Sequence, residues 1–258
     1  MKELVRAAEK RDMVVILDLH NYCRRFMNNE HTLIGNNELT IEDLASFWQA
    51  IAKEFSTFKN IYGYGLMNEP HDLAPETKWF DMAQASINAI REVDTNTLIM
   101  VGGNDWSSAE RWIEQSDTLK FLKDPANNLA FEAHVYFDKD ASGTYKYSYE
   151  EEECYPEKGI DRVKPFVEWI KQNKFHGFIG EYGIPDNDPR WNETLDLFLG
   201  YLQENGINGT YWAAGPWWDT YFMAITPKDG KDRPQMPIIE KYTCLLYTSD
   251  AADDTPCV

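Results

Sequence analysis

Six short runs of apolar, β-branched and aromatic residues recur along the chain, and each is followed by a polar residue and a stretch with helical periodicity. The runs cover residues 13–20, 61–69, 98–106, 129–136, 177–181 and 209–212. Runs that are apolar almost throughout are typical of strands buried on both faces, as in parallel sheets. Strands that alternate with helices predict an α/β fold.

Helices are predicted in the intervals between these runs. Residues 40–55 begin with an N-capping Thr and an acidic first turn, and an apolar face follows. That face consists of Leu44, Phe47, Trp48, Ile51 and Phe55. Residues 77–93, 160–172 and 190–204 have similar patterns, and residues 1–12 are predicted to form a charged helix. Six such units fit either an open doubly wound sheet or part of a closed barrel.

The chain is strongly acidic, with a formal net charge of −18. This charge argues against nucleic acids and anionic membranes as partners, because both are polyanions. No apolar run approaches the roughly 20 residues that span a bilayer. The spacing of the cysteines does not resemble a metal site, and whether Cys23 and Cys154 pair stays open.

The last fifteen residues, CLLYTSDAADDTPCV, differ from everything before them. Residues 244–249 resemble a translation of the mosaic end of a transposon-based sequencing adapter, and the following residues continue in frame with it. We interpret residues 244–258 as a non-native tail and expect it to be poorly ordered. The net charge without this tail is −15, so the chain remains acidic.

Polar and aromatic groups suited to sugar chemistry lie at the ends of five of the six runs. They are His20 and Asn21, Asn68 and Glu69, His134 and Tyr136, Glu181, and Trp212. In α/β barrels the catalytic residues lie at the carboxyl ends of several strands, whereas a doubly wound sheet binds its ligand at one switch point. Functional groups at so many strand ends favour a ring of strands.

The motifs LMNEP, HVY, GEYG and YWAAGPWW occur in an order and spacing that resemble glycoside hydrolase family 5, and its endo-β-1,4-glucanases most of all. The similar segments run from residue 1 to about residue 240. The resemblance implies a (β/α)8 barrel with an acid/base on the fourth strand and a nucleophile on the seventh. Residues 13–20 then correspond to the third strand. We therefore expect a partial catalytic domain over residues 1–243 that lacks the first two strands.

Two glutamates carry the chemistry that the resemblance implies. Glu69 corresponds to the acid/base, which protonates the leaving oxygen and then deprotonates water. Glu181 corresponds to the nucleophile. Glu181 follows the apolar stretch GFIG, which predicts that its carboxylate is buried. Because burying an unpaired charge costs free energy, a carboxylate at this position indicates a functional role.

The remaining strand-end residues are implied to bind the substrate. They are His20, Asn21, Asn68, His134, Tyr136 and Trp212. By the resemblance, Asn68 binds the sugar 2-hydroxyl, Tyr136 holds Glu181, and Trp212 forms the floor under the sugar at the cleavage point. His31, His71 and His176 match no motif position and are interpreted as packed structural residues.

The sequence thus predicts a retaining, endo-acting hydrolase of β-1,4-glucan that works by double displacement. The stretch FDKDASGTYKY is most similar to endoglucanase members, but a β-mannanase or another β-glycanase of the family is an alternative. A metal-dependent hydrolase would need an H-x-H or H-x-x-E-H cluster, and neither occurs, so no metal or cofactor is expected. The expected partner is a polysaccharide, and the complete protein is expected to be a monomer. The resemblance implies that it is secreted, because polymeric glucan lies outside cells.

The family pattern also includes an arginine at the end of the second strand, and the printed chain has no counterpart to it. We therefore expect the 258-residue chain to form an open sheet with two exposed edges, to aggregate and to hydrolyse carboxymethyl-cellulose negligibly. A noncatalytic glycan-binding fragment is the alternative from another class. Restoring an upstream segment is expected to restore solubility and turnover.

Overall fold

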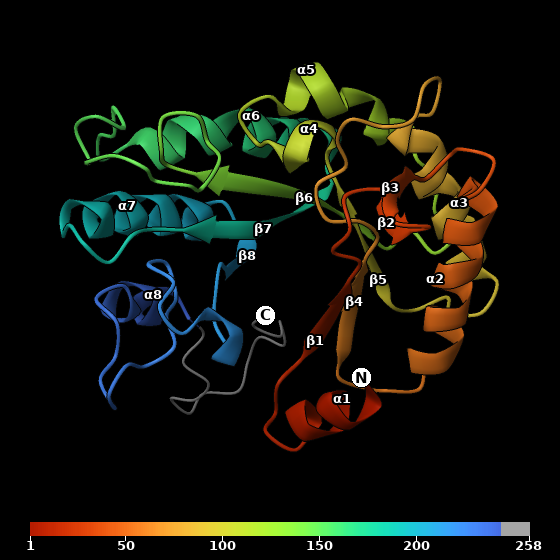
Figure 1. Cartoon of the computed structure of the whole chain (residues 1–258), viewed down its shortest axis with the longest axis horizontal. Coiled ribbons are helices and arrows are strands. Elements are labelled where there is room, and N and C mark those ends of the chain that lie inside the picture. The colour runs from red at the N-terminus through yellow and green to blue at the C-terminus, as the bar shows by residue number, and fades with distance from the viewer. Residues whose placement is uncertain (244–258) are drawn as a thin grey trace. The chain divides into compact units, whose positions relative to one another are not determined.

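The computed structural model describes residues 1–243, which fall into two compact units (Figure 1). Unit 1 comprises Met1–Ala133 and Glu168–Gly177, and unit 2 comprises His134–Val167 and the chain from Phe178 onward. Three elements contribute residues to both units: strand β6 (Leu129–Tyr136), helix α6 (Lys158–Asn173) and strand β7 (His176–Gly183). Residues 244–258, interpreted above as a poorly ordered tail, lie outside the described residues.

Unit 1 contains four parallel strands in the order in which they follow one another along the chain. They are β1 (Val15–Asp18), β4 (Ile61–Gly65), β5 (Leu98–Gly102) and the first part of β6 (Leu129–Tyr136). The register pairs Asp18 with Gly65 and Gly102 with Glu132. The carboxyl ends of these strands therefore lie at one edge of the sheet, where an α/β barrel carries its active site.

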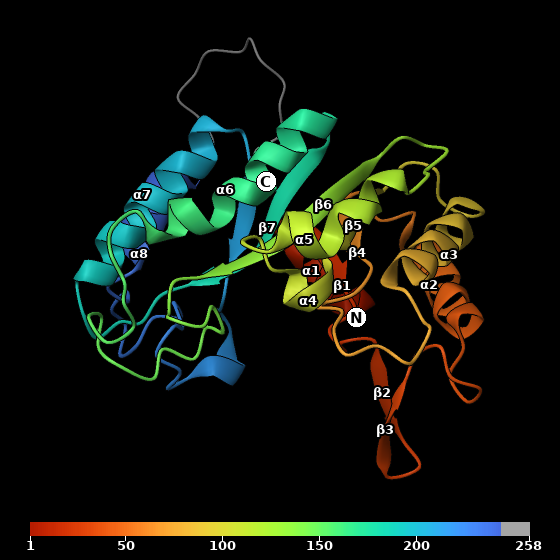
Figure 2. The same ribbon diagram turned by 90° about the horizontal axis from the view of Figure 1, so that it is seen from above.

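Three helices of unit 1 lie where the periodicity predicts them: α1 (Lys2–Glu9), α2 (Ile41–Phe55) and α3 (Trp79–Arg91). Three short ones were not predicted: α4 (Asn104–Ser107), α5 (Trp112–Ser116) and the 3₁₀ helix η1 (Asp117–Phe121). The predicted run 98–106 was therefore too long, because β5 ends at Gly102. Thr40 caps α2 through a capping box with Asp43, and α2 lies beside α3 (Figure 2). Phe47, from the predicted apolar face of α2, is 41% exposed.

Two buried indoles fix the strand ends of unit 1 from the helix side. Trp48 of α2 donates its Nε1–H to the carbonyl of Leu66 at 3.0 Å, and Trp79 of α3 donates to the carbonyl of Gly102 at 2.7 Å. Both tryptophans are about 1% exposed. These bonds satisfy carbonyl groups at or just beyond the ends of β4 and β5, so the segments that follow are held by the core.

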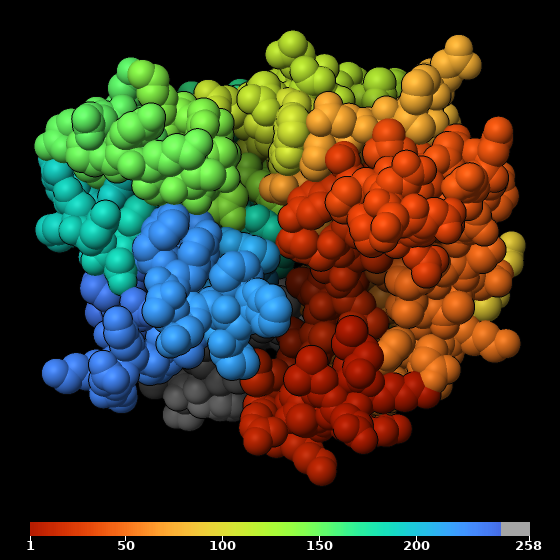
Figure 3. Space-filling model, viewed as in Figure 1, coloured from red at the N-terminus to blue at the C-terminus, as the bar shows by residue number. Residues whose placement is uncertain are grey.

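A hairpin that the sequence analysis did not anticipate lies between β1 and α2. Strands β2 (Arg24–Met27) and β3 (Glu30–Leu33) are antiparallel, and Asn28 and Asn29 form the turn with φ of 52° and 66°. Two positive φ values in a two-residue turn are typical of type I′. The hairpin extends away from the parallel strands, and most of its residues lie on the molecular surface (Figures 2 and 3).

Unit 2 contains the rest of β6, most of β7 (His176–Gly183) and β8 (Asn208–Tyr211), and β7 and β8 pair in parallel. Its helices are α6 (Lys158–Asn173), α7 (Arg190–Glu204), the 3₁₀ helix η2 (Pro216–Trp218) and α8 (Met236–Tyr242). The core contains fully buried rings, and the Phe137 and Phe198 ring centroids lie 5.2 Å apart. Six parallel strands that alternate with helices confirm the predicted α/β class.

Two further predictions concern the membrane and the cysteines. Among residues 1–243, no helix has the length and apolar character that crossing a bilayer requires. Cys23 is buried and Cys154 is half-buried, and each is a free thiol. Burial raises the pKa of Cys23 to about 12, so this thiol stays protonated at neutral pH.

Candidate active site

The ends of β1 and β4 bring His20 and Asn68 together in unit 1. His20 Nδ1 lies 3.1 Å from Asp18 Oδ2, while His20 Nε2 lies 3.1 Å from the Tyr22 hydroxyl and 3.3 Å from Asn68 Nδ2. Because an amide nitrogen can only donate, Nε2 accepts from Asn68, and Nδ1 carries the proton that is donated to Asp18. The imidazole is thereby fixed in one tautomer and one orientation.

Asn21 follows His20 and has a buried side-chain oxygen. Within the described chain, Asn21 Oδ1 has no hydrogen-bond partner. A buried acceptor without a partner costs free energy, so such groups usually have a reason to persist. A hydroxyl group on a bound ligand would satisfy this oxygen.

The turn that follows β4 sets the orientation of the Glu69 side chain. Asn68 N–H donates to the carbonyl of Leu19 at 2.9 Å, and His71 Nδ1 donates to the carbonyl of Glu69 at 2.8 Å. Glu69 has a φ of 47°, which is uncommon for a residue other than glycine. A residue persists in this region only where its surroundings determine it, so main-chain contacts on both sides of Glu69 set the direction of its half-buried side chain.

His71 is a site neighbour that the sequence analysis missed. Its ring stacks on Trp106 of α4 with 4.4 Å between ring centroids and 15° between planes, and Trp106 is 42% exposed. The only sequence signal was its place two residues after Glu69, beyond Pro70. The interpretation of His31 and His176 as packed residues was wrong, because both are exposed.

Strands β6 and β7 assemble three of the predicted residues in unit 2. The Tyr136 hydroxyl donates to Glu181 Oε2 at 2.7 Å, and His134 Nδ1 lies 3.6 Å from the same oxygen. His134 and Tyr136 are two residues apart, so both point to the same face of β6. All three side chains are buried, and Glu181 is 8% exposed.

Trp212 lies just beyond β8. Its backbone N–H donates to the carbonyl of Tyr182 at 2.8 Å. The centroid of its indole ring lies 5.0 Å from that of Trp218, at 66° between planes. A Cβ on Gly183 would lie 2.4 Å from the Trp212 carbonyl oxygen, so only glycine allows the main chain after Glu181 to approach so closely.

The pKa of Tyr221 is affected by the charge of Glu181. Burial raises the pKa of the Tyr221 phenol, and the negative charge of Glu181 raises it further, while a hydrogen bond with Trp212 acts in the opposite direction. Tyr221 therefore stays protonated at neutral pH and lies within the field of the carboxylate.

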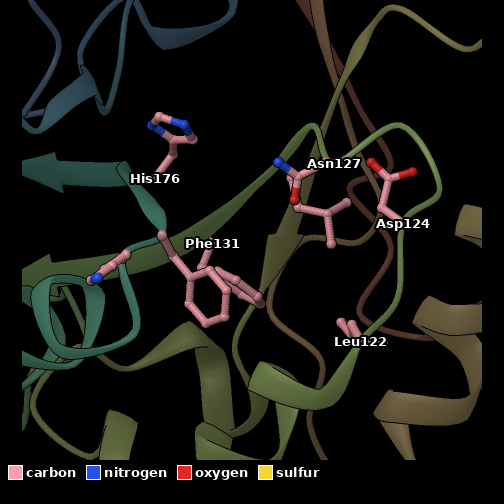
Figure 4. Close-up of a pocket in the computed structure, with 8 residues that line it drawn as sticks. Leu122, Asp124, Asn127, Phe131 and His176 are labelled. Carbon is pink, nitrogen blue, oxygen red and sulfur yellow. The ribbon is translucent and has the colours of Figure 1, made fainter.

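A cavity of about 120 Å³ lies in unit 1 at the amino ends of β6 and β7 (Figure 4). Its lining consists of Leu122, Asp124, Asn127, Leu129, Phe131, Lys174, Phe175 and His176. Because barrel active sites lie at the carboxyl ends of strands, this cavity is separate from the candidate site.

The predicted residues fall into two groups. His20, Asn21, Asn68 and Glu69 belong to unit 1, and His134, Tyr136, Glu181 and Trp212 belong to unit 2. In unit 2, a nitrogen and a carboxylate oxygen 3.6 Å apart could share a metal ion, but the Tyr136 hydroxyl already donates to that oxygen. The arrangement in unit 2 suits a carboxylate kept ionised and oriented.

Comparison with known proteins gives a consistent result. The sequence model of the family described as "Cellulase (glycosyl hydrolase family 5)" matches residues 1–217. Endo-beta-1,4-glucanase B of Emericella nidulans is 36% identical over 193 residues, which are 73% of this chain and 56% of that protein. A probable endo-beta-1,4-glucanase B of Aspergillus kawachii is 34% identical over 233 residues, which are 88% of this chain and 65% of that protein.

A solved structure supports the same fold. The Pseudomonas stutzeri endoglucanase Cel5A in complex with cellobiose has a TM-score of 0.86 and 41% identity, with coverage of 100% of this chain and 75% of that one. The predicted fold class, an incomplete (β/α)8 barrel whose described part has six parallel strands, is thus confirmed. The chain belongs to the cellulase family, glycosyl hydrolase family 5.

Proposed function

We propose that this chain carries the catalytic residues of a retaining, endo-acting hydrolase of β-1,4-glucan. The observation that carries the proposal is the buried Glu181 carboxylate, which accepts a 2.7 Å hydrogen bond from Tyr136. This hydrogen bond stabilises the ionised form and fixes the direction of the attacking oxygen. Family membership supports the assignment.

The first step forms a covalent glycosyl-enzyme. An oxygen of Glu181 bonds to the anomeric carbon while the bond from that carbon to the glycosidic oxygen breaks, and Glu69 gives its proton to the departing oxygen. Asn68 is proposed to bind the sugar 2-hydroxyl, an interaction that strengthens in the transition state, and its 3.3 Å hydrogen bond to His20 supports this role.

The second step releases the sugar with its original configuration. The Glu69 carboxylate takes a proton from water, the water oxygen bonds to the anomeric carbon, and the bond between that carbon and Glu181 breaks. We expect the two carboxyl groups to lie roughly 5–5.5 Å apart, the separation typical of retaining enzymes.

Aromatic faces and polar acceptors are proposed to hold the sugar rings. Trp212 offers a flat indole face of the kind that suits the apolar C–H face of a pyranose. The half-exposed Trp106, stacked on His71, offers a second such face near Glu69. Asn21 Oδ1 is the proposed acceptor for a sugar hydroxyl.

The substrate class is proposed from the relatives. Both curated relatives carry the name endo-beta-1,4-glucanase, and the Pseudomonas stutzeri enzyme was crystallised with cellobiose. We propose β-1,4-glucan as the polymer and a location outside the cell, because polymeric glucan does not enter cells.

The full-length gene product is expected to hydrolyse carboxymethyl-cellulose at least about tenfold faster than mannan, xylan or β-1,3-glucan, a difference of about 1.4 kcal/mol in transition-state stabilisation. The measurement is the release of reducing ends from each polymer, with viscosity followed in parallel. An endo-acting enzyme lowers the viscosity well before many ends appear. Mannan as the best substrate would contradict the assigned glycan, and binding without turnover would favour the noncatalytic alternative.

A further inference from the structure

The loop that follows β6, residues 138–145, is folded by a single buried carboxylate. Asp138 is 1% exposed and accepts backbone N–H groups from Gly143, Thr144 and Tyr145 at 3.0, 2.9 and 3.2 Å. It also accepts the hydroxyl of Ser142 at 3.1 Å. These four hydrogen bonds turn the loop back toward the strand end.

Gly143 lies directly against the ring of Tyr136. A Cβ at this position would lie 2.9 Å from both Cδ1 and Cε1 of Tyr136, which is closer than real Cβ atoms approach. The ring is 6% exposed, so it has little space into which it could retreat. Gly143 also has a φ of +71°, in the region that favours glycine.

Tyr145, at the other end of the loop, ties β6 to β7. Its hydroxyl accepts the Phe137 N–H at 2.9 Å and donates to the Gly183 carbonyl at 2.6 Å. Burial holds the pKa of Tyr145 well above its usual value, so the hydroxyl keeps its proton. The main chain beside Tyr136 and the main chain beyond Glu181 are therefore joined by one side chain.

We propose that Gly143 is a positioning residue of the active site: its missing side chain lets the loop press on Tyr136 and so directs the phenol hydroxyl to Glu181. The inference deepens the proposed function and rests on it. The loop acts on the nucleophile through Tyr136, and neither Gly143 nor Tyr145 takes part in bond making.

The dependence of kcat/KM on pH should change when Tyr136 is moved away from Glu181. The titratable groups that face Glu181 within unit 2 include Tyr136 and His134 from β6 and Tyr221 after η2. Because the Tyr136 hydroxyl stabilises the ionised carboxylate, moving the ring makes protonation of Glu181 easier. The acid limb of the kcat/KM profile should then move to higher pH.

Gly143→Ala in the full-length gene product is expected to lower kcat about 10–100-fold, with KM within about threefold, because small misplacements of reacting groups are costly. The acid limb should move up by roughly 0.5–1 pH unit. Gly230→Ala is the matched control, because Gly230 has a φ of +72° and nothing within 4 Å of an added Cβ. It imposes the same backbone strain without the contact, so kcat and the pH profile should stay at wild-type values.

A double-mutant cycle separates positioning from a general packing defect. In a Tyr136→Phe background the hydroxyl is gone, so Gly143→Ala should lower kcat by less than about threefold. Tyr145→Phe serves if Gly143→Ala fails to fold, because it removes the link between the strands and keeps the ring. Tyr145→Phe should move the acid limb of the kcat/KM profile to higher pH as Gly143→Ala does. In the Tyr136→Phe background it should likewise lower kcat by less than about threefold.

Additive losses in kcat, or a Gly143→Ala pH profile identical to that of Gly230→Ala, would overturn the inference while leaving the proposed function intact. A wild-type protein that fails to hydrolyse β-glucan would instead overturn the proposed function. The two failures are therefore distinguishable in one set of assays.

Discussion

Glu181→Gln should lower kcat on β-1,4-glucan by at least about 10⁴-fold, with the affinity for cello-oligosaccharides changed by less than about threefold. An amide cannot form the glycosyl ester, so the double displacement loses its first step. The amide oxygen can still accept the Tyr136 hydroxyl, which donates at 2.7 Å in the wild-type protein, so the shape of the site should survive. Steady-state kinetics and calorimetric binding measure the two quantities.

Glu150→Gln is the matched control for this substitution. This substitution removes the same charge in the same unit as Glu181→Gln. Glu150, however, is exposed and pairs with Arg190 on the surface. Its kcat should equal that of the wild-type protein. A Glu181→Gln protein that retains more than about a hundredth of wild-type kcat would contradict the assignment of the nucleophile.

Asp124→Asn is expected to lower the free energy of unfolding at pH 7 by about 3–5 kcal/mol, because it leaves the Arg91 guanidinium buried without its counter-charge. Arg91 binds the two carboxylate oxygens at 2.7 and 3.0 Å, and the two side chains are 3% and 2% exposed. Backbone N–H groups of Ala126 and Asn128 donate to the same carboxylate. The pair thus joins the end of α3 to the segment that leads into β6.

The pH dependence of this effect has a definite sign. Burial alone would raise the pKa of Asp124, but hydrogen bonds from Arg91, Asn128 and Ala126 outweigh it and the pKa is lowered. A lowered pKa contributes stability above the unfolded value of about 3.9, and this contribution is lost as the pH falls through the folded-state value. The difference between wild type and variant should be constant from pH 7 to about pH 5 and shrink in stronger acid.

Urea denaturation at several pH values measures this difference. Glu153→Gln is the control, because Glu153 pairs with Lys139 on the surface and both side chains are more than half exposed. It should have no measurable effect. An Asp124→Asn protein as stable as wild type at pH 7 would mean that the buried ion pair is dispensable.

The positions of the strands could be predicted from the sequence, but not where the main chain leaves the sheet. The run at residues 129–136 matches β6, because this strand is buried on both faces. The run at 61–69 continues past the end of β4 at Gly65, since Leu66 and Met67 are buried without being in the strand. Apolar residues indicate burial, and burial persists where the backbone turns to present Glu69.

The hairpin was missed for a related reason. Its strands are mostly exposed, so they lack the alternation of apolar and polar residues that marks a half-buried strand. The Asn28-Asn29 pair was the available signal, because asparagine tolerates the positive φ values of a type I′ turn.

Motif resemblance identified the residues of the candidate site, but not the groups that support them. Asn68 and Tyr136 lie in motifs that could be recognised, whereas Gly143 and Tyr145 act through contacts between segments. His71 carried no motif, and its bond to the carbonyl of Glu69 depends on a turn with a positive φ. Such contacts follow from backbone geometry, which residue patterns do not specify.

Trapping the covalent intermediate tests most directly whether Glu181 is the nucleophile of a retaining mechanism. A cellobioside that is fluorinated beside the anomeric carbon and carries a good leaving group should label the full-length gene product once. Mass spectrometry of the digest should place the sugar on Glu181. A label on Glu69 or another carboxylate, or turnover with no covalent label and an inverted product, would contradict the claim.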